Sequence, residues 1–246
     1  MDVALVVYEG VLHDECEAFR TVLTLLRGAR ITTVGAELGQ VGGPGGLQQV
    51  QATFDAVPDP DIVVVPGGLG VDRASLDEAL LGWLRMVEAG ADHVLASSTG
   101  SVVIAAAGLL HGRPAATHWL ASDRLQAYGS ARDASRLVVA GNVITAEGSV
   151  SAVEAAFALI ERVDGPQAVA EARATLIARG APHLRQPSRW QRSISQLFGR
   201  RTDVEPAEPD TVEVGDDEVT PRSVMVELVP VEELAPQRRR SRRSRR

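Results

Sequence analysis

The residues best placed to carry chemistry stand in three turns, each of which follows a predicted strand. A Ser-Thr-Gly turn at 98–100 follows the apolar run at 93–97 and opens a segment of small residues. A Pro-Gly-Gly turn at 66–68 follows the apolar run at 61–65, and residues 10–15 follow the first apolar run of the chain. In open α/β sheets, ligands bind outside the carboxyl ends of the strands. We therefore predict that these three turns form one site.

Ser98 is the residue of this site that could act as a nucleophile. A strand-to-helix turn can hold it in a strained conformation above the sheet, where the free N–H groups of a helix N-terminus stabilise negative charge. A serine hydroxyl is too weak an acid to ionise there, so it needs a general base. His118, which follows the next predicted strand, is the candidate base. The alternative, which we favour, is a small polar residue that caps the helix with its hydroxyl.

The elements around these turns alternate between strands and helices as far as about residue 165. Apolar runs predict strands, and apolar residues at helical spacing predict helices. A Gly-Asn pair at 141–142 predicts a hairpin, and the glycine-rich stretch 35–51 predicts a loop or a small hairpin. The predicted strands are 3–8, 30–34, 61–65, 93–97, 115–118, 137–140 and 143–145, and the predicted helices are 14–27, 76–89, 99–110, 119–128, 150–163 and 166–177. This order predicts an α/β fold, a three-layer sandwich with a mostly parallel central sheet.

The composition favours an α/β domain in the cytoplasm. Hydrophobic residues make up 45% of the 246 and aromatic residues only 4%, which indicates the aliphatic core of a parallel sheet. The single cysteine, Cys16, excludes an internal disulfide framework and a cysteine-based zinc site. The histidines lack metal-ligand spacing, so we expect neither a metal nor a cofactor. The chain shows no signal-peptide pattern and no apolar run of the roughly 20 residues that a membrane span needs.

The composition changes after about residue 182, which predicts a domain boundary there. Residues 183–201 form a basic amphipathic segment, and residues 202–246 are acidic and end in an arginine-rich stretch. We expect 202–246 to be a disordered tail. The arginines could attract nucleic acid, but the neighbouring acidic run opposes this and no base-reading motif is present. We therefore find no strong nucleic-acid or membrane signal.

Three blocks of the sequence resemble the ThiJ/PfpI family of the class I glutamine amidotransferase-like superfamily. They are VVVPGGLGVD, VLASSTGSVVIAAAGLLHGRPAATHW and GNVITAEGSVSAVEAAFALIER, and the resemblance covers about residues 1–180. It is nearest to the isonitrile-hydratase group and to the amidase-like domain of AraC-type regulators. The resemblance implies a flavodoxin-like fold. The family reads Cys-Thr-Gly where this chain has Ser98-Thr99-Gly100, and Thr-His-Trp at 117–119.

The resemblance also implies roles for residues in the other two turns. The family's acid lies five positions after the glycine of the first loop, which makes Glu15 the matching carboxylate; in the family it contacts and tunes the cysteine. Main-chain N–H groups of Gly67 or Gly68, and of Thr99, are expected to form an oxyanion-type pocket. Without the resemblance, Glu15 could equally be a first-turn carboxylate that the helix dipole stabilises. Family members usually associate, so a homodimer is expected.

Two classes of function remain. The first is an inactive or non-canonical family member that binds a small-molecule ligand or acts in regulation, and the loss of the cysteine favours it. The alternative is a serine-variant hydro-lyase or amidohydrolase, similar to isonitrile hydratase, that uses Ser98 with His118 and Glu15. A third possibility, that Cys16 is a displaced reactive thiol, is disfavoured because Cys16 should face another side of its helix.

Overall fold

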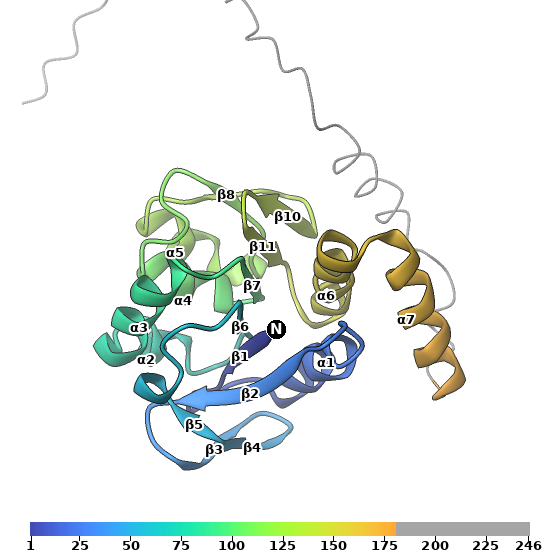
Figure 1. Ribbon diagram of the computed structural model, residues 1–246. Coiled ribbons are helices and arrows are strands. Elements are labelled where there is room, and N and C mark those ends of the chain that lie inside the picture. The colour runs from blue at the N-terminus through green and yellow to red at the C-terminus, as the bar shows by residue number, and fades with distance from the viewer. Residues whose placement is uncertain (181–246) are drawn as a thin grey trace, which may run out of the picture. The chain divides into compact units, whose positions relative to one another are not determined.

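A computed structural model describes residues 1–180, and its centre is a seven-stranded, mostly parallel sheet (Figure 1). The strand order is β10-β11-β7-β6-β1-β2-β5. Only β10 runs antiparallel to its neighbour, because it forms a hairpin with β11. The bounds are β1 (Asp2–Val6), β2 (Arg30–Gly35), β5 (Ala52–Thr53), β6 (Ile62–Val65), β7 (His93–Ser97), β10 (Leu137–Ala140) and β11 (Val143–Ala146).

Helices cover both faces of this sheet and complete three layers (Figure 1). One face carries α1 (His13–Leu23) and α6 (Ser149–Asp164), which pack against each other, and α7 (Pro166–Ala178) packs on α6. The other face carries α3 (Glu78–Glu88) and α4 (Gly100–Ala106), with the short α2 (Val71–Ala74) and α5 (Ser122–Ala127) beside them. The predicted α/β sandwich with a mostly parallel sheet is confirmed.

The residues of the central strands explain why they occupy the middle of the sheet. All four residues of β6, IVVV, are buried, and so are the last four of β1 and of β7. Strands covered by helices on both faces must be apolar on both sides, so they show no alternation. Asp77 begins α3 by accepting hydrogen bonds from the N–H groups of Ala79 and Leu80.

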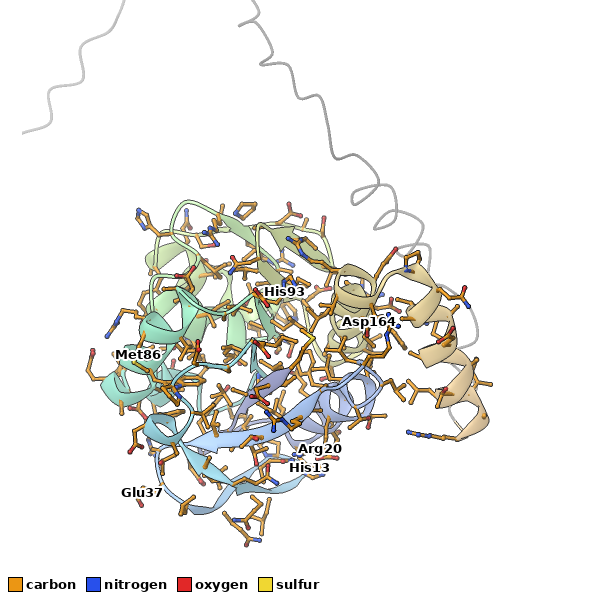
Figure 2. The ribbon with its side chains drawn as sticks, in the orientation of Figure 1. His13, Arg20, Glu37, Met86, His93 and Asp164 are labelled. Carbon is orange, nitrogen blue, oxygen red and sulfur yellow. The ribbon has the colours of Figure 1, made fainter. Side chains whose placement is uncertain are left out.

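Two hairpins appear where the sequence predicts them. The glycine-rich stretch contains β3 (Gly39–Gly43) paired with β4 (Gly46–Val50) in a separate small sheet. Two α1 side chains labelled in Figure 2, His13 and Arg20, hold this hairpin because both hydrogen-bond to Gln48 of β4. In the β10–β11 hairpin, Gly141 has φ 66°, which favours glycine.

Two predicted elements differ from the structure, and one 3₁₀ turn in it was not predicted. The strand expected at 115–118 is only β8 (Pro114–Ala115), which pairs with β9 (Ala131–Arg132) outside the main sheet. The backbone leaves strand pairing there because the Ala116 N–H donates to the Thr145 side chain. The helix expected at 119–128 is divided into a 3₁₀ turn, η2 (Trp119–Ala121), and α5, and a second 3₁₀ turn, η1 (Phe54–Ala56), precedes β6.

Two helices also end earlier than their apolar spacing predicts. α4 ends at Ala106, since Gly108 adopts φ 92°, and α1 ends at Leu23 rather than at residue 27. The segments predicted at 183–201 and 202–246, and the domain boundary at 182, lie outside the described residues. No helix among residues 1–180 is long and apolar enough to cross a membrane.

Candidate functional site

Ser98 forms a sharp turn between β7 and α4 and has a left-handed backbone. Its φ is 54°, and it is the only non-glycine residue with positive φ within residues 1–180. Three hydrogen bonds hold this conformation: its N–H donates to the Ala146 carbonyl at 2.8 Å, and its carbonyl accepts from the Ser101 and Thr117 hydroxyls at 2.8 and 3.1 Å. Strained backbone of this kind persists only when its surroundings hold it, and it is concentrated at functional sites.

The Ser98 side chain lines a cavity of about 570 Å³. Its hydroxyl makes no hydrogen bond with any side chain or backbone group of residues 1–180. α4 begins after Thr99 and has no side-chain cap, so the expectation that the Ser98 hydroxyl caps the helix is wrong. The hydroxyl is therefore free to bond a molecule in the cavity.

The two glycines after β6 contribute in different ways. A Cβ atom at Gly67 would lie 2.6 Å from the Ser98 Cβ, so this position must be glycine for the turns to meet. The Gly67 N–H donates to Glu15 and does not line the cavity. Gly68 does line it, but its N–H donates to the Thr99 hydroxyl at 2.9 Å. Of the amides expected in an oxyanion pocket, only that of Thr99 has no acceptor among residues 1–180.

Glu15 is fully buried and accepts three hydrogen bonds from residues 1–180, none of them from Ser98. Its Oε2 accepts from the Gly67 N–H at 2.7 Å and from the Ser97 hydroxyl at 2.5 Å, and its Oε1 accepts from the Ser149 hydroxyl at 3.1 Å. The structure therefore places the carboxylate against the residue before Ser98, whereas the family resemblance implies contact with residue 98. Ser97 and Ser149 were not predicted as site residues.

Two further groups beside Glu15 are buried and un-ionised. The Tyr8 hydroxyl donates to the Pro66 carbonyl at 2.9 Å, and burial, followed by the negative charge of Glu15, raises the pKa of Tyr8 far above its usual range. Burial also raises the pKa of the Cys16 thiol to about 12. A thiol that is buried and protonated is inert, so the structure contradicts the possibility that Cys16 is a displaced reactive centre.

His118 lines the same cavity as Ser98, but no hydrogen bond joins the two side chains within the described residues. The ring is half-buried, stacks on Trp119 with 5.8 Å between centroids, and caps η2 because its Nδ1 accepts from the Leu120 N–H at 3.3 Å. In a neutral imidazole, an Nδ1 that accepts leaves the proton on Nε2. The remaining nitrogen is then a donor rather than a base.

The walls of the cavity are mostly apolar and its mouth is charged. Leu12, Val71 and Ala121 form the inner wall, and Leu69 and Leu120 stand at the rim, 80% and 67% exposed. At the mouth, Arg124 of α5 pairs with Asp72 of α2 at 2.9 Å, and Asp123 lies beside them. Among residues 1–180, no cluster of three histidine, cysteine or acidic side chains could hold a metal ion.

This α/β sandwich brings together a strained residue at the end of a central strand, a glycine turn against it and a buried acid on the first helix. The DJ-1/PfpI family model matches residues 1–162, and the chain belongs to this family. Among curated proteins, the chain is 36% identical to isonitrile hydratase of Pseudomonas putida over 145 residues, which are 58% of this chain and 64% of that protein.

Two other relatives are longer than this chain. The HTH-type transcriptional regulator CdhR of Pseudomonas aeruginosa is 36% identical over 109 residues, 44% of this chain and 32% of that protein. Protein DJ-1 homolog A of Arabidopsis thaliana is 31% identical over 173 residues, 67% of this chain and 43% of that protein. The chain thus matches less than two thirds of the length of each of these curated relatives.

Solved structures support the fold. A ThiJ/PfpI family protein from Pseudomonas syringae superimposes with a TM-score of 0.69 at 24% identity, covering 80% of this chain and 86% of that one. Oxidized DJ-1 of Toxoplasma gondii gives a TM-score of 0.64 at 24% identity, covering 72% and 97%.

Proposed function

We propose that this chain is a DJ-1/PfpI domain without the catalytic cysteine, which binds a small molecule in the Ser98 cavity as a binding or regulatory protein. The free Ser98 hydroxyl carries the proposal, because it lines the cavity and has no partner within residues 1–180. Apolar pockets with a few convergent polar groups are the usual form of small-molecule sites. The unpaired Thr99 N–H offers a second polar contact at the same place.

The lining of the cavity indicates the class of ligand. Ser98 and Thr99 provide hydrogen bonds at the base, and leucine and valine side chains provide an apolar wall. At the mouth, Arg124 and Asp72 neutralise each other, which leaves the charge of Asp123. This arrangement favours a neutral or cationic molecule with a compact polar head and an apolar substituent, and it disfavours carboxylates.

The surroundings of Ser98 also argue for binding rather than catalysis. A serine nucleophile needs a base within hydrogen-bond reach. Glu15 is held by three other donors, and the acceptor nitrogen of His118 is occupied by the Leu120 N–H. Neither group accepts a proton from Ser98 in this arrangement.

Calorimetric titration with N-cyclohexylformamide tests the proposal, because this probe is neutral and joins an amide head to an apolar ring. We expect saturable binding to the full chain, and binding about 3- to 10-fold weaker in Ser98→Ala, the usual effect of losing one hydrogen bond. Ser130→Ala is the matched control, since Ser130 is also buried but donates to the Arg113 carbonyl away from the cavity. Cyclohexanecarboxylate should bind more weakly than N-cyclohexylformamide, because the charge of Asp123 at the mouth disfavours a carboxylate. Equal affinity in Ser98→Ala and wild type would overturn the proposed role of the hydroxyl.

The alternative function is a serine-variant hydro-lyase or amidohydrolase that uses Ser98, His118 and Glu15. The left-handed turn at Ser98 and the cavity that Ser98 and His118 both line favour this alternative. Because the chain is 36% identical to an isonitrile hydratase, cyclohexyl isonitrile is the probe. Product formation that falls strongly in Ser98→Ala and equally in His118→Ala, with no further loss in the double variant, would establish one catalytic unit. Our preferred proposal expects no turnover above background in any of these chains.

We also propose that two copies of the chain associate. Support comes from the family and from the exposed apolar side chains of Leu69, Trp119 and Leu120, which are 80%, 63% and 67% exposed. Apolar side chains gathered on a surface are typical of interaction sites. Light scattering at micromolar concentration should give twice the 26.1 kDa mass of the chain, and the mass of one chain would contradict the proposal.

A further inference from the structure

The buried carboxylate of Glu15 is bound by side chains from two elements other than its own helix. Ser97 ends β7, Ser149 begins α6, and the hydroxyl of each donates to Glu15. The Gly67 N–H supplies the third bond. A buried carboxylate needs such donors, because an unpaired charge is very costly inside a protein. The two hydroxyls are the donors that a substitution can remove without altering the backbone.

Glu15 and Ser98 both lie against Gly67, although no hydrogen bond joins them within residues 1–180. Gly67 touches both, since its N–H donates to Glu15 at 2.7 Å and a Cβ there would meet the Ser98 side chain at 2.6 Å. Ser97 is the next residue in the chain and donates to the same Oε2. A carboxylate released by its serine donors would therefore find residue 98 nearby as a replacement donor.

We propose that Ser97 and Ser149 are positioning residues that hold the Glu15 carboxylate away from residue 98 and so keep the Ser98 hydroxyl free for a ligand. The ligand in this inference rests on the proposed function, whereas the position of the carboxylate rests on the contacts of Glu15 and Gly67. It explains why the acid that the family resemblance assigns to residue 98 is bonded elsewhere. Removing either serine should redirect Glu15 to the side chain at position 98.

A thiol introduced at position 98 reports this redirection. In Ser98→Cys, the rate of alkylation by iodoacetamide between about pH 5 and pH 10 gives the apparent pKa of the thiol, because only the thiolate reacts. A carboxylate that accepts from the thiol stabilises its protonated form. Adding Ser97→Ala should therefore lower the thiolate fraction at neutral pH about 10-fold. Adding Ser149→Ala should lower it less, since its bond of 3.1 Å is longer than that of Ser97 at 2.5 Å.

The charged and titratable groups around position 98 set the controls. Among residues 1–180 they are Glu15 and Cys16 of α1, Tyr8 after β1, His118 before η2, Asp72 of α2, and Asp123 and Arg124 of α5. Within residues 1–180, Glu15 is the group that accepts from both serine hydroxyls, so adding Glu15→Gln should abolish both shifts. Ser149→Thr retains a hydroxyl at an exposed position. When it is added to Ser98→Cys, the pH dependence of alkylation should be that of Ser98→Cys alone. Ser130→Ala, which removes another buried hydroxyl, should change nothing.

Two results would overturn the inference. One is a pH dependence of alkylation in Ser98→Cys that neither Ser97→Ala nor Ser149→Ala changes. The other is a change in the thiol pKa that persists when Glu15→Gln is added. If a variant at the buried Ser97 does not fold, the Ser149 pair of Ala and Thr gives the same answer at an exposed position. These outcomes are independent of the ligand titration, so failure of the proposed function leaves this test intact.

Discussion

The two ends of strand β7 differ in whether their buried polar groups have hydrogen-bond partners. At its carboxyl end, Ser97 joins a fully buried carboxylate that has three hydrogen-bond donors. At its amino end, the buried Nδ1 of His93 has no hydrogen-bond partner in the described part of the chain. One end of β7 thus surrounds a carboxylate that has three donors, and the other end contains an imidazole whose Nδ1 is unpaired within residues 1–180.

This difference indicates which end of β7 contributes more to the stability of the fold. Satisfying Glu15 takes residues from a loop, a strand and a helix, so the carboxylate ties those elements together. His93 has no partner at Nδ1 within residues 1–180, and its hydrogen bond to the Asn142 backbone offsets the burial of the ring only in part. Substitutions at the two ends of β7 should therefore change the free energy of unfolding by different amounts and in opposite directions.

Glu15→Ala should have the largest effect on stability. Its removal leaves three donors without an acceptor, and each unsatisfied buried group costs roughly 1–3 kcal/mol. We expect the free energy of unfolding, from urea titration, to fall by about 3–5 kcal/mol. Glu78→Ala is the control, because its ion pair with Arg85 is exposed and should contribute under about 1 kcal/mol. Similar losses in the two variants would remove the basis of the comparison.

Gly67→Ala should have the next largest effect. The added Cβ would meet the Ser98 Cβ at 2.6 Å, and overpacking of this kind costs about 1–3 kcal/mol. Gly82→Ala provides the matched control, because nothing lies within 4 Å of a Cβ at this position in α3. Replacing this helical glycine by alanine should stabilise the chain by about 0.5–1 kcal/mol. Thermal and urea unfolding of both variants would show the opposite signs.

The neighbouring serines 97 and 98 should also respond with opposite signs to glycine. Ser98→Gly relieves a left-handed backbone that costs about 1–2 kcal/mol, against an entropy cost of about 0.5–1 kcal/mol, so a gain of about 0.5 kcal/mol is expected. Ser97→Gly loses the bond to Glu15 and should destabilise by about 1–2 kcal/mol. A loss of stability in Ser98→Gly would mean that its φ of 54° is not strained.

The smallest effect is expected at His93 and depends on pH. Burial, followed by the positive charge of Arg162, lowers the pKa of His93 below its usual 6.5. The unfolded chain therefore binds the proton first, so the stability from a neutral His93 is present above about pH 6.5 and is lost as the pH falls towards the folded pKa. His93→Gln should match wild type near pH 8 and lose less stability by pH 5. An unchanged pH dependence would contradict this.

The carboxyl ends of the strands could be located from the sequence because their signals are local. Apolar runs that stop at Ser-Thr-Gly and Pro-Gly-Gly indicate both the strands and the turns, and the structure brings these turns together. The bonds of Glu15 to Ser97 and Ser149 could not be predicted in this way. Ser97 ends an apolar strand and Ser149 lies 134 residues from Glu15, so only the assembled sheet makes them neighbours.

The orientation of His118 was beyond the sequence for a related reason. Its position after a predicted strand indicates the right edge of the sheet, but which ring nitrogen is occupied depends on the 3₁₀ turn that it caps. The sequence pattern there predicts an ordinary helix at 119–128. A single backbone N–H, from Leu120, therefore changes the histidine from a candidate base into a donor.

The contact between Gly67 and Ser98 limits how this site can change in evolution. Position 67 accepts only glycine, because a Cβ there would lie 2.6 Å from the Ser98 Cβ, an atom that serine and cysteine share at position 98. Serine and cysteine differ there by one atom, oxygen or sulfur, and have nearly the same shape. A lineage can therefore exchange them in either direction while the cavity around them persists, so gain or loss of chemistry at this position is a short evolutionary step.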